Sequence, residues 1–371
     1  MTARIRTQPA TGRLVSLVAG LLAIASVAGA QANIRNAKLE SRPGADLAAA
    51  FQGLSNETGA IWIGYAVPAQ DPDWNACCYD SGRDGDRCCG RCRLDEGHAA
   101  SETRGGNVAG GPVQLESGNQ ALVLYRVENR EIQRIRAYSD GCEIDAGGKT
   151  VYWLTGVSTT ASVDFLQQRA SRPLPDGDRR DGVVDGAMMA IAAHRDPAAD
   201  RALASLMAAD KPLATRKQAA FWAANGRGRT GFELVRTALL DTSNPEPLRK
   251  HLTFAVSLCR EPDAVDTLTR VAKSDTSATV RGEAIFWLAQ KAGRKAAAAI
   301  TDVIAQDPDT KVKERAVFAL SQLPKDDGVP RLIEVARNNR NPAVRKQAIF
   351  WLGQSRDPRA LAFFEEVLAR P

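Results

Sequence analysis

The chain of 371 residues has few of the residues, and none of the motifs, that mark the common enzyme classes. It holds only three histidines: His98, His194 and His251. No G-x-S-x-G, H-E-x-x-H or phosphate-binding glycine loop occurs in it. This argues against the hydrolases, metalloproteases and nucleotide-binding enzymes that those motifs mark. We therefore expect no catalytic residue and no cofactor, although an enzyme without these motifs is still an open alternative.

The chain also lacks a strong charge of either sign. It carries 49 basic and 43 acidic residues, a formal net charge of +6. That is a weak excess for a chain of this length, and nucleic-acid-binding proteins usually gather a much larger one. We expect no nucleic-acid partner.

Long apolar runs are missing, apart from one near the start. Leu14–Ala28 has no charge, follows three arginines and ends in the small residues Ala28–Ala30. It is shorter than the roughly 20 residues that a spanning helix needs, and the whole pattern is typical of a secretory signal peptide. We predict that residues 1–30 are such a signal, that the mature chain begins at Gln31 with its net charge lowered by three, and that it is secreted or periplasmic without a stable membrane span.

Cysteine is scarce in the second half of the chain and clustered in the first. A clustered, even set in an exported chain predicts a disulfide framework, whose connectivity the sequence does not fix. The six predicted disulfide cysteines are Cys77, Cys78, Cys88, Cys89, Cys92 and Cys142. The seventh, Cys259, lies alone in a helical segment, and we expect a buried, unpaired thiol.

Metal binding is the alternative for the cysteine-rich loop. The stretch "CCGRC" with His98 nearby has a faint likeness to a zinc site, and Asp80–Asp86 has a faint likeness to a calcium loop. The twelfth position of that loop, where calcium loops carry glutamate, is Arg91. We therefore predict disulfides and no metal site.

What the chain does contain is a repeat. Five phenylalanines recur at spacings of 33, 32, 32 and 32 residues, each with a basic residue five positions earlier. They are Phe221, Phe254, Phe286, Phe318 and Phe350. One more step back reaches Met189, in a degenerate first copy. Apolar segments with helical spacing and turns rich in Asp, Asn, Gly and Pro separate the copies, so each unit reads as helix, turn, helix, turn. Stacked units of this kind form an α-solenoid.

The repeated phrase carries a family resemblance. "VRKQAIFWLG" (Val344–Gly353) resembles the HEAT-repeat signature, and the short period is similar to that of the HEAT-like repeats of phycobilisome lyases. The resemblance covers about residues 181–371. It implies an α-solenoid with binding surfaces along its inner helices. The lyase activity is not carried over, because no residue suited to a chromophore accompanies it.

A helical wheel separates the two aromatic residues of the phrase. At 100° per residue the tryptophan that follows three of the phenylalanines falls in the apolar stripe, and the phenylalanine falls opposite. We expect the tryptophans in the core and the five phenylalanines in a file pointing away from it. That file either packs on neighbouring repeats or lines a groove for a partner. The basic file is Arg216, Arg249, Arg281, Lys313 and Arg345. The HEAT resemblance implies that these side chains pair internally with turn residues such as Asp275 and Asp307.

The first half of the mature chain follows another pattern. Strands are predicted at Ala60–Ala69, Gln120–Val127, Glu131–Tyr138 and Thr150–Val157, with a helix at Ala161–Ala170. We predict a multidomain chain: a small disulfide-bonded β-rich N-terminal domain (31–170), a linker (171–182) and an all-α HEAT-like solenoid (183–371).

Two hypotheses for the function follow. The first is an exported, non-enzymatic scaffold that binds a protein or peptide, or its own N-terminal domain, along the inner helices of the solenoid. The second is an enzyme or metal-binding sensor whose site lies in the cysteine-rich loop.

Overall fold

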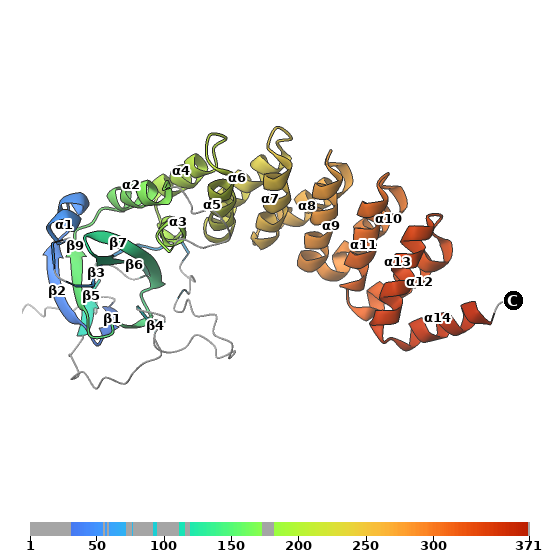
Figure 1. Cartoon of the computed structure of the whole chain (residues 1–371), viewed down its shortest axis with the longest axis horizontal. Helices are drawn as coiled ribbons and strands as arrows, with labels where there is room; N and C mark the ends of the chain where they lie inside the picture. The colour runs from blue at the N-terminus through green and yellow to red at the C-terminus, as the bar shows by residue number, and fades with distance from the viewer. Residues whose placement is uncertain are drawn as a thin grey trace, which may run out of the picture.

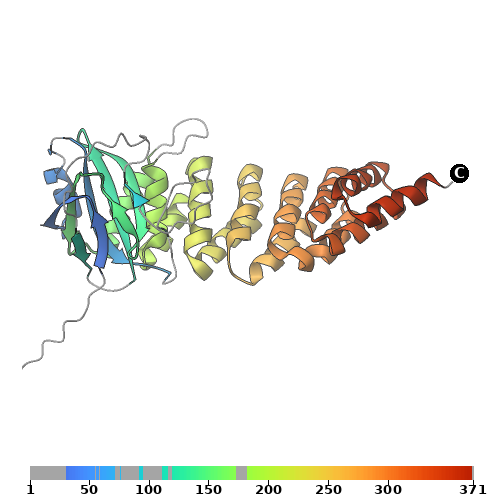
Figure 2. The ribbon, with the colours of Figure 1, turned by 90° about the horizontal axis from the view of Figure 1, so that it is seen from below.

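In a computed structural model of the chain, the molecule is elongated, with β-sheets at one end and stacked helices along the rest (Figures 1 and 2). The structure describes residues 31–54, 56–57, 59–71, 76, 92–94, 111–115, 119–172 and 182–369. Within these residues every helix is too short or too polar to cross a bilayer.

Two sheets form the N-terminal region. The larger has the strand order β2-β9-β3-β6-β7 and the smaller has the order β4-β8-β1-β5. The strands of the larger sheet are β2 (Lys38–Pro43), β3 (Ile61–Pro68), β6 (Gln120–Glu128), β7 (Glu131–Ser139) and β9 (Thr150–Thr155). Those of the smaller are β1 (Gln31–Arg35), β4 (Cys92–Arg93), β5 (Gly111–Gln114) and β8 (Glu143–Asp145). All four predicted strands are present in the larger sheet, β6 and β7 being joined as an antiparallel pair.

Alternation along the strands gives the larger sheet two buried faces. Trp62 and Leu124 pack with Ile34 and Ile144 of the smaller sheet in one apolar cluster. Tyr65 and the other alternate residues face the second cluster, which is shared with helices. This explains why β3 and β6 are apolar almost throughout, since a sheet covered on both sides needs no polar face.

Helices cover the second face and continue into the solenoid. Helix α1 (Leu47–Leu54) and α2 (Thr159–Ala170) lie beside the sheet, and α3 (Val184–Ala193) packs on β7. A Cβ built on Gly186 of α3 would lie 2.1 Å from the carbonyl oxygen of Ile135 in β7. Only glycine therefore allows this close contact of helix and strand. One apolar cluster runs from the sheet through α3 into the repeats, so the cores on the two sides of the predicted linker are continuous.

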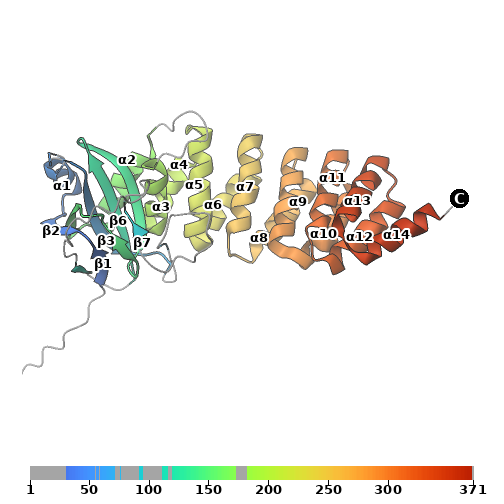
Figure 3. The same ribbon diagram turned by 60° about the horizontal axis from the view of Figure 1, so that its bottom comes forward.

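The solenoid consists of two layers of alternating helices. Its helices are α3, α4 (Pro197–Leu206), α5 (Leu213–Gly226), α6 (Gly228–Leu240), α7 (Glu246–Leu258), α8 (Asp263–Ser274), α9 (Ala278–Ala292), α10 (Ala297–Gln306), α11 (Thr310–Ser321), α12 (Lys325–Asn338), α13 (Pro342–Ser355) and α14 (Pro358–Leu368). Helices α5, α7, α9, α11 and α13 contact one another in sequence and stand side by side (Figure 3). Each carries one of the five phenylalanines. This confirms the helical repeat read from the sequence.

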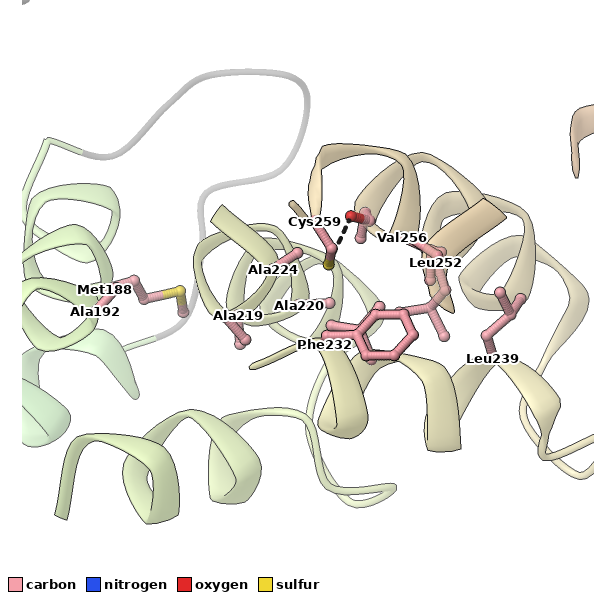
Figure 4. Packing of buried hydrophobic residues seen from close by; sticks show 14 of the residues in the cluster. Met188, Ala192, Ala219, Ala220, Ala224, Phe232, Leu239, Leu252, Val256 and Cys259 are labelled. Atoms are coloured by element: carbon pink, nitrogen blue, oxygen red, sulfur yellow. Dashed lines mark hydrogen bonds between the residues drawn. The ribbon is translucent and has the colours of Figure 1, made fainter. Parts of the chain in front are cut away.

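The turn residues predicted between repeats act as helix caps. Ser277, Asp309 and Asn341 are the N-caps of α9, α11 and α13, and each side chain accepts a hydrogen bond from a backbone N–H of the first turn. These caps stand 32 residues apart, so the period of the caps equals the period of the phenylalanines. Inside the solenoid the core is filled by small and aliphatic residues such as Ala220, Leu252 and Val256, packed around Phe232 (Figure 4).

Candidate functional site

The five repeat phenylalanines and three tryptophans form one continuous row of rings across the solenoid, which we call the aromatic ladder. Neighbouring ring centroids lie 4.8–6.2 Å apart, within the range of favourable aromatic pairs. In spatial order the rings are Trp222, Phe221, Phe254, Trp287, Phe286, Phe318, Trp351 and Phe350. The ladder links α5 to α13 through side chains of the same helix row.

Tryptophan appears in alternate repeats and bridges them. Trp287 lies between Phe254 of the preceding repeat, at 4.8 Å, and Phe286 of its own helix, at 4.9 Å. Phe286 and Phe318 stack directly, 5.9 Å apart with an angle of 5° between ring planes. The repeats in between carry alanine where Trp287 and Trp351 stand. The ladder therefore has a period of two repeats.

The wheel prediction was wrong about the tryptophans. Trp287 and Trp351 are half-buried, beside the core rather than inside it. A wheel assumes that each helix packs on one side, whereas a helix in a solenoid also packs on its neighbours before and after. The tryptophan ring fills the space beside the phenylalanine of the preceding repeat. At Trp287 and Trp351 the Nε1–H is buried and meets no hydrogen-bond acceptor among the described residues, while that of Trp222 donates to Asp185 at 3.1 Å.

The five phenylalanines differ in how far they are buried. Phe221, Phe254, Phe286 and Phe318 are half-buried, because each ring stacks on an adjacent repeat and keeps one edge in solvent. Phe350, at the α13 end of the ladder, is 52% exposed. Each of the two hypotheses for the phenylalanines therefore describes part of the structure. The rings pack between neighbouring repeats, and their outer edges form an apolar strip.

Polar side chains border the strip. Arg315 lies over the ring of Phe286, 5.8 Å from its centroid, and pairs with Glu283. His251 is half-buried: its Nε2–H donates to the carbonyl of Lys217 at 3.0 Å, and its ring meets Phe254 edge-on. Burial lowers the pKa of His251. The border carries charges of both signs.

The basic file pairs inside the solenoid, as the resemblance implied. Arg281 donates to both carboxylate oxygens of Asp307, at 2.7 and 3.0 Å, and Arg249 meets Asp275 at 2.5 Å. Arg216 donates instead to Asn244. Arg345 and Lys313, in the last two copies, bond to backbone carbonyls. The pairing with Asp275 and Asp307 is therefore confirmed, and these arginines hold adjacent repeats together rather than meeting a ligand.

A buried polar chain joins the sheet to the solenoid, and sequence reasoning missed it. His194, the C-cap of α3, places Nδ1 2.6 Å from the carbonyl of Ala190 and Nε2 2.8 Å from the hydroxyl of Ser162. The carbonyl can only accept, so Nδ1 carries the proton and Nε2 accepts from Ser162. The chain continues from Ser162 to Tyr65 and then Tyr125, each step 2.6 Å. We call these four side chains the junction chain.

The junction chain is structural rather than catalytic. A serine hydroxyl beside a histidine is the arrangement of a nucleophile and its base, but Ser162 and His194 have no exposed surface. Burial lowers the pKa of His194 to about 4 and raises that of Tyr65 to about 12. All four groups are therefore neutral near pH 7. Arg227, also buried, donates to the His194 carbonyl and to the Asp200 carboxylate, which fixes α3 against α4.

The cysteine predictions have different outcomes. Cys259 is free and buried, as predicted, and burial raises the pKa of its thiol to about 11. Cys77, Cys78, Cys88, Cys89 and His98 lie outside the described residues, as does the side chain of Cys92. The disulfide framework stays a prediction. Within the described residues no three His, Cys, Asp or Glu side chains gather as a metal site, which leaves the loop itself untested.

Comparisons with known proteins agree on the repeats. Residues 232–321 and 297–371 match the family model described as HEAT repeats. HEAT repeats are therefore present over residues 232–371, and the C-terminal solenoid as a whole is HEAT-like. Among curated proteins no match is found.

Three of the solved structures that resemble this chain have low identity and low TM-scores. Human deoxyhypusine hydroxylase in complex with glycerol is 16% identical, over 57% of this chain and 91% of that chain, with a TM-score of 0.30. The complex of CpcE and CpcF of phycocyanin lyase from Nostoc sp. PCC7120 is 22% identical, over 42% of this chain and 99% of that chain, with a TM-score of 0.32. A Kap121p mutant is 11% identical, over 55% of this chain and 26% of that chain, with a TM-score of 0.36. Such low scores carry no argument about function.

Proposed function

We propose that this chain is an exported, non-enzymatic scaffold that binds another protein through the aromatic ladder of its HEAT repeats. The observation that carries the proposal is the outer edge of the ladder, which leaves five phenylalanines partly in solvent along one row of helices. Large aromatic side chains that are held rigidly and half-exposed are the residues that most often anchor protein interfaces.

The C-terminal end of the ladder supports the same proposal. Besides Phe350, the side chains of Ile349, Leu361 and Leu368 on α13 and α14 are exposed. An apolar surface of this kind on a soluble chain marks an interaction site. A solenoid end without a partner usually carries a polar outer face.

The identity of the occupant is a further part of the proposal. The described β-strands pack on α3, at the start of the solenoid, and Asp71 reaches Arg260 after α7 at 3.5 Å. The ladder continues for three more repeats beyond that point. We propose that these repeats meet a separate protein rather than the chain's own N-terminal region, and that export places this protein in the periplasm or outside the cell.

Site-specific photocross-linking tests the proposal. A photoreactive residue placed at Lys346, four positions before Phe350 and exposed, should capture a defined protein from the native exported fraction. The matched control is Glu334, which is exposed on α12 in the other helix layer. Capture at Lys346 with none at Glu334 is the expected result. Equal capture at both positions, or none at Lys346, would contradict a ladder-centred interface.

A further inference from the structure

A cavity of about 600 Å³ opens on the N-terminal region, away from the ladder. It lies between α1, α2 and the tight turn that joins β6 to β7. Its inner wall is apolar: Phe51 of α1 and Phe165 of α2 are buried with ring centroids 4.6 Å apart, and Val127 and Ile132 of the strands complete it. A cavity of this size accommodates a small organic molecule.

Three arginines line the same cavity, and we call it the arginine pocket. Arg130 comes from the β6–β7 turn, while Arg169 and Arg172 come from the last turn of α2 and its end. Among the described residues of the lining, Glu131 is the one carboxylate. Among the described residues none of these three arginines forms an ion pair with a carboxylate, and the guanidinium groups of Arg130 and Arg172 have no hydrogen-bond partner either. The pocket thus has an excess positive charge beside an apolar wall.

Arg169 is the arginine closest to the apolar wall. Its guanidinium carbon lies 3.2 Å from the centroid of the Phe165 ring, and its Nη1 donates to the carbonyl of Phe165 at 2.8 Å and to Gln168 at 3.2 Å. These contacts hold the group in place without neutralising it. Burial and the nearby Arg172 lower the pKa of Arg169. A bound anion would remove this electrostatic penalty.

We propose that the arginine pocket binds an organic anion with an apolar body, its carboxylate held by Arg169 and Arg172 and its apolar part against Phe51 and Phe165. The guanidinium fork matches a carboxylate in geometry as well as in charge. An apolar wall alone would favour a neutral ligand, and exposed arginines alone would favour inorganic anions. Their combination selects a molecule with both features. A free fatty acid and the C-terminus of a peptide with an apolar last residue are two sources of this one chemistry.

Calorimetric titration of the full chain with simple probes tests the proposal. Decanoate represents the free fatty acid, and a short peptide ending in phenylalanine represents the peptide. Decanol, the amide form of the peptide and inorganic phosphate each lack one of the two features. We expect at least one of the two acids to bind, about tenfold or more tightly than its uncharged counterpart, since a charge-assisted contact is lost. Which acid binds identifies the source.

Variants locate the binding. Arg172→Gln, at an exposed position where folding is not at risk, should weaken the acid about tenfold, and Arg169→Gln should weaken it further. The matched control is Arg270→Gln, an exposed arginine on α8, which should leave binding unchanged. The proposal is overturned if neither acid binds, if decanol or phosphate binds as tightly as the acid, or if Arg172→Gln and Arg270→Gln behave alike. Phe350→Ser should have no effect here, so this result is independent of the ladder.

Discussion

The basic file and the phenylalanines of the aromatic ladder run along the same helices, one residue of each per repeat, and have opposite environments. In the first three copies the arginine five residues before the phenylalanine is buried, and Arg249 and Arg281 pair with Asp275 and Asp307. The aromatic ladder turns outward and keeps part of every phenylalanine in solvent. Side chains that recur once per repeat in both rows connect one repeat to the next. Their exposure shows the difference: the buried arginines only connect repeats, whereas the partly exposed phenylalanines also form a surface that a partner can contact.

The largest effect is expected from breaking the inner row. Arg281→Ala leaves the carboxylate of Asp307, whose side chain is 4% exposed, buried without its partner. This should cost about 3–5 kcal/mol of unfolding free energy, measured by chemical denaturation. Arg345→Ala is the matched control, because Arg345 contacts only carbonyls at the last repeat and should cost far less. Equal losses would show that the carboxylate pairing has no special role.

Acid should weaken the junction chain, which belongs to neither row. The pKa of His194 is about 4 in the fold and about 6.5 in an unfolded chain. The unfolded state therefore binds more protons between these values, so the contribution of His194 is complete above pH 6.5 and is lost as the pH falls through 4. The loss should total about 3 kcal/mol.

Denaturation of the full chain at a series of pH values between 7 and 4 measures this dependence. In His194→Gln the slope should be reduced relative to the wild type. If that variant does not fold, Ser162→Ala provides a second comparison, because its His194 keeps the burial but lacks the serine donor. A wild-type stability that does not change across this range would contradict the assignment of a neutral buried histidine.

In the aromatic ladder, the loss of a ring should lower the unfolding free energy more than the loss of a polar group. Trp287→Ala removes a ring that bridges two phenylalanines and should cost about 2–3 kcal/mol, below the usual loss for a fully buried ring. Trp287→Phe keeps a ring and removes an indole N–H that has no acceptor, so it should cost less than about 1 kcal/mol. Thermal or chemical denaturation of both variants checks the order. A larger loss for Trp287→Phe would mean that the indole N–H has a partner.

The sequence predicted the features that repeat and missed the features that do not. The 32-residue period and its polar turns can be read because each copy supports the others, and the Arg–Asp pairing was implied by the HEAT resemblance. The larger sheet was read from its long apolar strands, whereas β1 and β8 have short, mixed sequences that carry no clear alternation. Ser162 and His194 stand in unrelated local patterns, and nothing in either pattern places them within a hydrogen bond of each other. The arginine pocket was not predictable from the sequence for the same reason, because its arginines come from a turn and a helix end that are far apart in the chain and meet only in the fold.

The smallest change in stability and the most direct test of the account come from Phe350. It is the most exposed ring of the ladder. Phe350→Ser should change the unfolding free energy by no more than about 0.5 kcal/mol. In the same preparation it should weaken binding of the protein captured at Lys346 about tenfold or more. Glu334→Ser, at an exposed position on α12 in the other helix layer, should change neither. A variant Phe350→Ser that is as stable as the wild type and binds that protein just as tightly would contradict the claim that the ladder is the binding surface.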